Sequence, residues 1–282
     1  MKLLTWNIQW CRGCDGRVDP ERIVRDAHAF ADFDVLCLQE VAANFSDLAG
    51  SLGENQFQLL AELLPQYTAV PGAAVDIDGL RGKRQVFGNL IFSRLPVLRV
   101  LRLQLPWPYS THHEGMPRML LEATVQTGHG PLRVMTTHLE YYSATQRAAQ
   151  VGAIRARHAE ACVHARHALS RKKENGPFKA IQQPSSAILT GDFNFKPEDA
   201  LWKEIQSAFD DHAPPFRDTW TQLHPDRPHP YTIGVHDRAQ WPQPYACDFI
   251  FATEDLLPRI RRVEVEARTR ASDHQPLLVE LE

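Results

Sequence analysis

The sequence predicts an α/β protein in which helices cover β-sheets. Short apolar runs of strand length are interspersed with capped, amphipathic segments of helix length. Two pairs of apolar runs are separated by breaker or turn residues, which is typical of adjacent strands. Strands before and after helices favour sheets covered by helices. No repeat and no shift in composition marks a linker, so residues 1–282 are expected to form one domain.

The N-terminal half begins with a predicted strand and a capped helix. Lys2–Ile8 has the apolar character of a strand. Asp19 is a favoured N-cap residue and Pro20 is favoured in the first helical turn, so a helix is expected to begin there. The short apolar run Asp34–Gln39 is interpreted as a buried strand. Further expected elements are a helix at Gln56–Leu64, ending at Pro65, strands at Val86–Ser93 and Val97–Leu103, and a hairpin of Met119–Gln126 with Leu132–Thr137.

The C-terminal half contains the strongest helix pattern. Alanine is abundant from Ser143 to about Arg171, and Ser143 with Gln146 has the spacing of a capping box. The remaining expected elements are a strand at Ala187–Leu189, a helix starting at Pro197–Asp199, a mostly irregular span at Ala213–Pro244, and closing strands at Phe249–Phe251, Arg261–Glu266 and Leu277–Leu281.

Composition argues against several classes of protein. Apolar residues make up 43% and charged residues 23% of the 282 residues, so a large core can form without a disulfide or a structural metal. The net charge of −3 argues against a strongly basic nucleic-acid coat protein. No apolar run approaches the length of a membrane span, so membrane insertion is not expected. A monomer is the default expectation.

The cysteines favour a reducing compartment. Their odd number and scattered spacing do not fit a disulfide framework: Cys11, Cys14, Cys37, Cys162 and Cys247. The apolar stretch after Met1 is too short for a signal peptide, and cleavage would remove the first strand. A cytoplasmic protein with five free thiols is therefore expected. The pair Cys11 and Cys14 leaves open an alternative, a redox sensor.

Polar side chains recur at the ends of the predicted strands. Five of them follow apolar runs and three precede such runs: Asn7, Glu40, His138, Asp192 and Asn194, then Asp248, Asp273 and His274. Loops at strand ends are where α/β folds place ligand groups. Taken singly, each Asp or Asn here could be a turn former or a helix cap. Together, hard oxygen ligands of this kind suit Mg²⁺ or Mn²⁺, whereas soft metals favour cysteine or clustered histidine.

Six short motifs run in order along the chain: Thr5–Asn7, Leu38–Val41, Gly88–Ser93, Thr137–Leu139, Gly191–Asn194 and Ser272–His274. Their set and order resemble those of the endonuclease/exonuclease/phosphatase superfamily, which has the deoxyribonuclease I-like fold. The resemblance implies a four-layer α/β sandwich, in which helices flank two packed mixed β-sheets. It also implies a phosphoesterase that uses a divalent metal, Mg²⁺ or Mn²⁺.

The resemblance implies roles for the residues at the metal and the attacking water. Glu40 matches the principal metal ligand, and Asn7 and Asp273 match residues close to the metal or its waters. Asp192 matches the residue that orients or deprotonates the attacking water. Asn194 matches a residue that helps to hold water or phosphate.

The resemblance also implies the groups that contact the substrate phosphate. His274 matches a histidine that contacts the scissile phosphate, and Asp248 matches the carboxylate that orients it. His138 matches a second phosphate-contacting histidine. Arg118 stands where bacterial members often carry arginine, and Arg147 follows His138 at the start of the long helix. Either arginine could contact phosphate or form a surface ion pair.

The expected reaction is hydrolysis of a phosphodiester, in a nucleic acid or a nucleotide-like substrate, by direct attack of activated water. The strings Trp6–Trp10 and Gly191–Pro197 depart from those of exonuclease III and abasic-site nucleases, which argues against abasic-site repair. The motifs look closer to the branch with tyrosyl-DNA phosphodiesterases and deadenylase-like enzymes. A phosphomonoesterase or lipid-headgroup phosphatase is the alternative enzyme, and a catalytically silent binding protein is the alternative outside enzymes.

Overall fold

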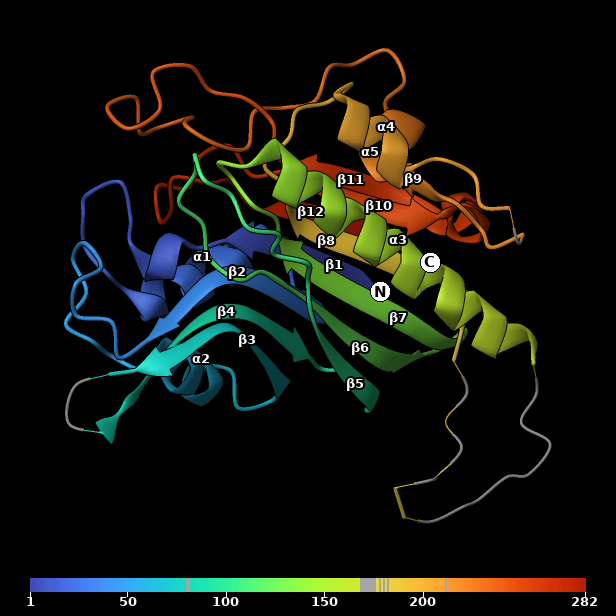
Figure 1. The fold of residues 1–282 in the computed structure, drawn as a ribbon, viewed down its shortest axis with the longest axis horizontal. Helices are drawn as coiled ribbons and strands as arrows, with labels where there is room; N and C mark the ends of the chain where they lie inside the picture. The colour runs from blue at the N-terminus through green and yellow to red at the C-terminus, as the bar shows by residue number, and fades with distance from the viewer. Residues whose placement is uncertain (80–81, 168–175, 178, 180, 182, 211) are drawn as a thin grey trace.

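The computed structural model describes residues 1–79, 82–167, 176, 177, 179, 181, 183–210 and 212–282. Over these residues the chain forms two six-stranded mixed β-sheets that pack face to face, with helices on both outer sides (Figure 1). The predicted four-layer α/β sandwich is confirmed.

The first sheet joins the two ends of the chain. Its strand order is β11-β12-β1-β2-β4-β3. The strands are β11 (Ile260–Val265), β12 (Leu277–Leu281), β1 (Lys2–Asn7), β2 (Val35–Ala43), β4 (Arg84–Ser93) and β3 (Thr68–Asp78). Strand β1 is antiparallel to β12 and parallel to β2. The Met1 amino group donates a hydrogen bond of 2.6 Å to the Leu281 carbonyl, so both termini lie at this sheet.

The second sheet contains the predicted hairpin and a parallel crossover. Its strand order is β5-β6-β7-β8-β10-β9. The strands are β5 (Val97–Gln104), β6 (Met119–Thr127), β7 (Gly130–His138), β8 (Ala187–Asp192), β10 (Asp248–Thr253) and β9 (Phe216–Asp218). Strands β7 and β8 are parallel, and the long helix α3 (Ala144–Arg166) lies in the connection between them.

Helices cover the outer faces of both sheets. Helices α1 (Pro20–Phe30) and α2 (Gln56–Leu63) pack on the first sheet through one apolar cluster. Helices α3 and α4 (Ala200–Ile205) pack on the second sheet through another, and Figure 1 shows α3 running across that sheet. The short elements are α5 (Thr219–Leu223) and the 3-10 helices η1 (Gln9–Cys11) and η3 (Glu254–Arg259). Within the described residues, no helix is both long and apolar enough to cross a bilayer.

The alternation of side chains along β1 shows how the layers are built. Leu3 lies in the apolar cluster between the sheets, whereas Leu4 and Trp6 lie in the cluster beneath α1 and α2. Each such fully buried side chain contributes roughly 1.5–3 kcal/mol of stability. Because side chains alternate along a strand, Thr5 and Asn7 share the inner face with Leu3. The apolar pattern therefore directs Asn7 toward the second sheet.

Most predicted elements are confirmed, including the Asp19 cap, which accepts a hydrogen bond from the Arg22 amide. Strand β3 is not among the predicted elements. It contains Pro71 and Gly72, which are tolerated because β3 is an edge strand. Strand β9 and helix α5 were also missed, because they are short and lie within the Pro-rich span expected to be loop.

Two predicted helix boundaries needed correction. Helix α4 begins at Ala200 and not at Pro197–Asp199, since Glu198 has a left-handed backbone with φ +70°. Ser143 caps α3, but the Gln146 side chain donates to the Pro108 carbonyl, so only half of the capping box forms. The predicted end of the long helix, about Arg171, falls outside the described residues.

Gly191, the penultimate residue of β8, cannot be replaced by a larger residue without strain. Its φ is +138°, and a Cβ built on it would lie 1.9 Å from the Thr137 carbonyl oxygen of β7. A side chain here would therefore separate β8 from its parallel neighbour.

We expect Gly191→Ala to lower the free energy of unfolding by about 3 kcal/mol or more, because it combines backbone strain with a clash between strands. Urea unfolding followed by circular dichroism measures this loss. Gly152→Ala is the matched control: Gly152 lies inside α3 with no atom within 4 Å of its Cβ position, so alanine should stabilise the helix by about 0.5–1 kcal/mol. Equal effects of the two substitutions would contradict the prediction.

Candidate active site

The predicted site residues meet at the ends of strands from both sheets. Three of them share one rung of the second sheet, because Asp192 pairs with His138 on β7 and with Asp248 on β10. Asn7 ends β1 and Glu40 lies in β2, on the first sheet. The face-to-face packing of the sheets brings Asn7 and Glu40 next to the three residues of the second sheet, although Asn7 and Asp248 are 241 residues apart in the sequence.

Asp192 lies at the centre of the cluster. Asn7 Nδ2 donates to Asp192 Oδ2 at 3.0 Å, and His138 Nε2 and His274 Nε2 lie 3.5 and 3.7 Å from the same oxygen. The backbone N–H of Asn194 donates to Asp192 Oδ1 at 3.0 Å. Burial, followed by repulsion from Asp248, raises the pKa of Asp192 to about 6. This carboxylate can thus hold a proton near neutral pH.

A β-bulge turns Glu40 into the cluster. The register of β2 against β4 shifts between Leu38 and Val41, so two residues of β2 oppose one of β4. Glu40 has φ +59°, a strained value for a residue with a side chain. Leu38 and Val41 both pack against the helices, and Glu40 accepts a hydrogen bond of 3.0 Å from Asn7 Nδ2. Regular alternation would have placed Glu40 on the helix side.

Burial raises the pKa of Glu40 to about 7, and the negative charge of Asp273 adds to this effect. Asp273 is tightly held: its Oδ2 accepts hydrogen bonds of 2.9 Å from Gln9 Nε2 and Trp241 Nε1. Its Oδ1 accepts a hydrogen bond from the Ser272 hydroxyl at 3.2 Å. The structure thus places Asp273 next to the site with a fixed orientation.

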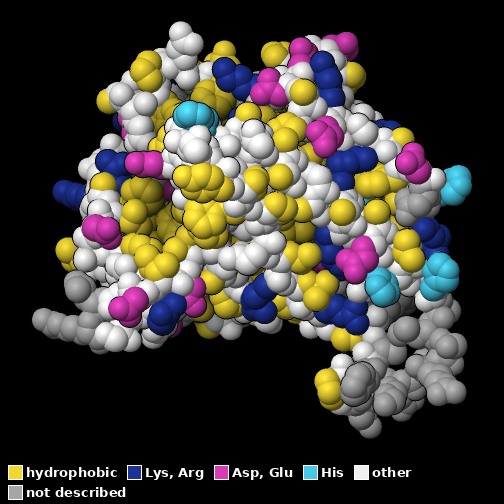
Figure 2. All heavy atoms as spheres, viewed as in Figure 1, with side chains coloured by type: hydrophobic (Ala, Val, Ile, Leu, Met, Phe, Trp, Pro, Cys, Tyr) yellow, Lys and Arg dark blue, Asp and Glu magenta, His cyan; other side chains and the backbone are white. Residues whose placement is uncertain are grey.

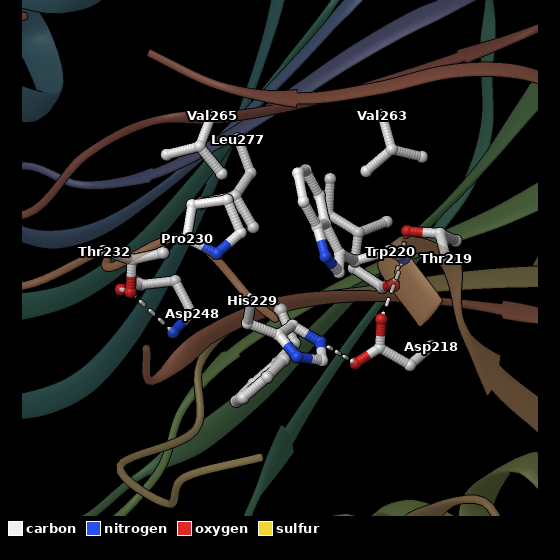
Figure 3. Close-up of a pocket in the computed structure, with 12 residues that line it drawn as sticks. Asp218, Thr219, Trp220, His229, Pro230, Thr232, Asp248, Val263, Val265 and Leu277 are labelled. Carbon is white, nitrogen blue, oxygen red and sulfur yellow. Dashed lines mark hydrogen bonds and ion pairs between the residues drawn. The ribbon is translucent and has the colours of Figure 1, made fainter. Parts of the chain in front are cut away.

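His274 is held as a cation by carboxylates. Its Nδ1 lies 2.8 Å from Asp248 Oδ2, the pairing that the resemblance implied. Thr232 donates to the same oxygen at 2.6 Å, and Figure 3 shows Thr232 beside Asp248. Burial by itself lowers the pKa of His274, but Asp248, Asp273 and Asp192 together raise it well above its usual range. His274 can therefore donate a proton through Nε2.

His138 has the opposite electrostatic character. Its Nδ1 lies 3.8 Å from Glu40 Oε1, whereas its Nε2 faces Asp192, so the ring lies between the two carboxylates. Burial lowers the pKa of His138 well below its usual range, and the positive charges of Arg118 and His274 lower it further. The two histidines thus differ in protonation: His138 is neutral, and His274 is charged.

Asn194 is fixed immediately behind Asp192. Its backbone has φ +52°, and its Nδ2 donates to the Leu139 carbonyl at 2.9 Å. The backbone amide of Asn194 donates to Asp192, so the main chain and the side chain are both fixed where Asn194 lines the cleft.

The two predicted arginines both hold the loop that follows β7. Arg118 Nε lies 3.4 Å from Glu140 Oε2, and both side chains are buried. Arg147 Nη1 donates to the carbonyls of Glu140 and Tyr141 at 2.6 and 2.9 Å. Arg118 Nη1 is buried and has no hydrogen-bond partner among the described residues. The sequence interpretation missed Glu140, although it directly follows the Thr137–Leu139 motif.

The site lies at the bottom of a cleft of about 470 Å³. Tyr141 and Tyr142 meet edge to face at 4.9 Å between ring centroids, and Trp241 lies 6.0 Å from Tyr141. Tyr142 is 61% exposed, so its ring is available to a ligand. Five carboxylates line the described cleft, against one arginine: Glu40, Glu114, Glu140, Asp192 and Asp273, with Arg118.

The wider surface has no continuous basic stripe on the face shown in Figure 2, where Lys and Arg side chains are scattered among acidic and apolar ones. Long nucleic acids bind mainly through cations along the phosphate backbone. The described part of this face therefore offers few contacts of that kind.

A second histidine–carboxylate pair lies behind the site and has a structural role. His229 Nε2 lies 2.8 Å from Asp218 Oδ2, and Figure 3 shows the two side chains pointing toward each other. Asp218 also accepts from Trp202 Nε1 and caps α5. The adjacent cavity is about 10 Å³, which admits no more than about one water molecule.

Cys11 and Cys14 are both free thiols, as are Cys37 and Cys247. Burial raises the pKa of Cys11 well above its usual range. The pKa of Cys14 is also raised, by burial and then by Asp237 and Asp273. Reactive cysteines have a lowered pKa, so these environments do not favour a redox sensor.

The sequence matches the family described as the Endonuclease/Exonuclease/phosphatase family over residues 4–274. No curated protein matches the chain. Among solved structures, an endonuclease/exonuclease/phosphatase from Beutenbergia cavernae superposes with a TM-score of 0.68 at 24% identity, covering 100% of this chain and 71% of that one.

Two further structures have similar folds, and one of them has an activity in its name. A mannosyl-6-phosphatase from Bacteroides thetaiotaomicron superposes with a TM-score of 0.66 at 17% identity, covering 100% of this chain and 99% of that one. A truncated TDP2 from Caenorhabditis elegans superposes with a TM-score of 0.63 at 18% identity, covering 99% and 95%. At these identities the likeness concerns the fold.

The raised pKa of Glu40 leads to a prediction about stability. A carboxyl whose pKa is about 7 when folded and about 4.5 when unfolded binds more protons in the folded state between these pH values. The metal-free protein therefore loses stability as pH rises through this window. Each pH unit corresponds to about 1.4 kcal/mol, so the whole effect is up to about 3 kcal/mol.

We expect Glu40→Gln to stabilise the metal-free protein at pH 8 by up to about 3 kcal/mol, and to have little effect at pH 4. Chemical unfolding at both pH values in the presence of chelator measures the difference. Glu62→Gln, on the exposed side of α2, controls for the loss of one negative charge. An equal gain in stability at pH 8 in both variants would rule out the burial of the Glu40 charge, and its repulsion from Asp273, as the cause.

Proposed function

Because the chain belongs to the endonuclease/exonuclease/phosphatase family, we propose that it is a divalent-metal-dependent phosphoesterase that hydrolyses a phosphodiester by direct attack of an activated water. One observation carries the proposal. Asn7, His138 and His274 converge on a single oxygen of Asp192, and Asn7 also contacts Glu40. The cluster thus combines a proton acceptor, a proton donor and hard oxygen ligands in one cleft.

The residues fit a divalent cation. The ligand atoms of Glu40, His138 and Asp192 lie within 4.8 Å of one another. The raised pKa values of Glu40 and Asp192 indicate buried negative charge that the protein itself does not fully neutralise. We propose that Glu40 is the principal ligand, with Asn7 and Asp273 close to the ion or its waters. Bound Mg²⁺ or Mn²⁺ would neutralise charge on the phosphate oxygens and the leaving oxygen.

The protein's own groups would handle the protons. Asp192 orients the attacking water and accepts its proton, since its pKa of about 6 lies close to working pH. His274, held by Asp248, donates a hydrogen bond to the phosphoryl oxygen as negative charge accumulates there. Neutral His138 contacts the phosphate from the other side of Asp192. Asn194, which lines the cleft, helps to hold water or phosphate.

Substrate contacts outside the reacting phosphate involve the arginines and the aromatic rings. The unpartnered Nη1 of Arg118 supports a contact with a substrate oxygen, either directly or after a small shift of the side chain. We propose that Arg147 acts close to the substrate through the Tyr141–Tyr142 loop that it holds. The exposed tyrosine rings can stack on a base or another flat group, which supports a nucleic acid or nucleotide-like substrate.

The charge of the cleft argues against a long polyanion and leaves a second candidate. Only one arginine accompanies five carboxylates in the lining, so the cleft is suited to a substrate with a single phosphate group, whether a diester or a monoester. A phosphomonoesterase or a lipid-headgroup phosphatase would fit this pattern, and one structural neighbour is named as a sugar phosphatase. The catalytically silent binding protein is less well supported, because every motif position retains its functional residue.

We further propose that residues 1–282 act as one domain and as a monomer. Pairing of β1 with β12 joins the two ends of the chain, and one chain supplies every side chain of the site. The free thiols of Cys11, Cys14, Cys37 and Cys247 support work in a reducing compartment such as the cytoplasm.

We expect hydrolysis of bis-p-nitrophenyl phosphate to stop in excess chelator and to return with Mg²⁺ or Mn²⁺, because the ligands are hard oxygen atoms. The rate of p-nitrophenol release measures this. The monoester p-nitrophenyl phosphate, assayed in parallel, separates the two candidate enzymes. Full activity in chelator would contradict the metal mechanism, and no hydrolysis of either ester or of nucleic acid with any metal would favour the silent binding protein.

Because His274 and Asp248 act as a unit, their substitutions should not be additive. We expect His274→Ala to lower kcat by about 10²–10³-fold, the usual loss for one transition-state donor. Asp248→Asn should lower kcat too, and the double variant should lose little more than the worse single variant. Losses that multiply would show that Asp248 does not act through His274. Asp218→Asn, at the second histidine–carboxylate pair, is the control for a buried carboxylate without a catalytic role.

A further inference from the structure

Cys247 is an unusual member of the site. It is fully buried, and its Sγ lies against polar atoms: 3.5 Å from Asp248 Oδ2 and 4.0 Å from Thr232 Oγ1. Buried thiols usually pack among apolar groups. The oxygen-ligand mechanism proposed above gives this sulfur no role.

The sulfur is close to two groups that ligate soft metals. One ligand atom each from Asp192, Cys247 and His274 lie within 4.8 Å of one another. Asp192 Oδ2 and His274 Nε2 are 3.7 Å apart. Tetrahedral Zn²⁺, with bonds of about 2.0–2.3 Å, requires ligand atoms about 3.3–3.7 Å apart, so small side-chain movements complete the geometry.

The second ring nitrogen of His274 strengthens this assignment. Its Nδ1 lies 2.8 Å from Asp248 Oδ2, which leaves Nε2 directed toward Asp192. Histidines that bind zinc usually donate their other ring N–H to a carboxylate in this way. Three ligands also leave a fourth position for water or a phosphate oxygen.

We propose that Asp192, Cys247 and His274 form an inhibitory site for a thiophilic divalent cation, Zn²⁺ or Cd²⁺. This site shares Asp192 with the oxygen-rich cluster around Glu40 and differs from it by the sulfur ligand. The Sγ–H bond of Cys247 and the Nε2–H bond of the charged His274 break as the metal–sulfur and metal–nitrogen bonds form, and both protons pass to solvent. Mg²⁺ does not compete for this triad, because hard cations avoid thiolates. The inhibitory effect rests on the proposed function, since the ion would occupy Asp192 and His274, the groups proposed to contact the attacking water and the phosphate. Zinc binding itself does not depend on the proposed function.

X-ray absorption of the Zn²⁺-loaded protein tests the site directly. The Cys14→Ser protein is used, because Cys14 is half-buried near Asp273 and could itself bind zinc. We expect one sulfur at about 2.3 Å and otherwise nitrogen and oxygen ligands. A zinc shell without sulfur would overturn the proposal, and this measurement holds even if a Cys247 variant does not fold.

Competition with a chromophoric zinc chelator measures the contribution of Cys247. Cys247→Ser should weaken Zn²⁺ binding by about 100-fold, since it exchanges a soft ligand for a weak hydroxyl. Cys14→Ser is the matched control and should retain the wild-type affinity. Equal Zn²⁺ affinity in wild type and Cys247→Ser would place the ion elsewhere, for instance at Glu40 and His138, and overturn the proposal.

Activity then tests the consequence. We expect Zn²⁺ to abolish Mg²⁺-supported ester hydrolysis at concentrations that saturate the sulfur site, and Cys247→Ser to need about 100-fold more. Zinc binding through sulfur without inhibition would contradict the inhibitory role. Absence of Mg²⁺-supported hydrolysis would instead be a failure of the proposed function, because the zinc-binding measurements do not depend on turnover.

Discussion

The structure depends on holding several carboxylates close together and largely buried at one cleft. Burial and mutual repulsion raise the pKa of Glu40 to about 7 and of Asp192 to about 6. Hydrogen-bond donors offset part of the free-energy cost of burying these charges. The side-chain amide of Asn7 donates to both carboxylates, and the His274 cation lies beside Asp192. The charge that remains creates a binding site for a cation, so a feature that destabilises the metal-free fold provides the proposed function.

The backbone imposes this arrangement through register and strain. Pairing of β7, β8 and β10 sets three site residues on one rung, and Gly191 permits the close approach of β7 and β8 just before it. The bulge in β2 turns Glu40 toward the opposite sheet. These features lie deep in two sheets with a shared apolar core, which can hold a strained residue in place.

The outer part of the cleft is organised around a different carboxylate, Glu140. It pairs with Arg118 and accepts from the Tyr142 amide, while Arg147 holds the carbonyls of the same loop. The exposed tyrosines are thereby fixed at the mouth. The proposed reaction chemistry and the proposed substrate contacts thus use different layers of the cleft, and Cys247 would add a soft ligand to the inner one.

Local periodicity, capping residues and motif order predicted the α/β layering, most strand and helix positions, and the set of polar residues at strand ends. The partner of each group was decided by tertiary structure. That Glu40 faces Asn7 requires a bulge, and that Trp241 fixes Asp273 requires a loop contact over 32 residues. No local pattern encodes such contacts, since they arise only when distant strands and loops pack together.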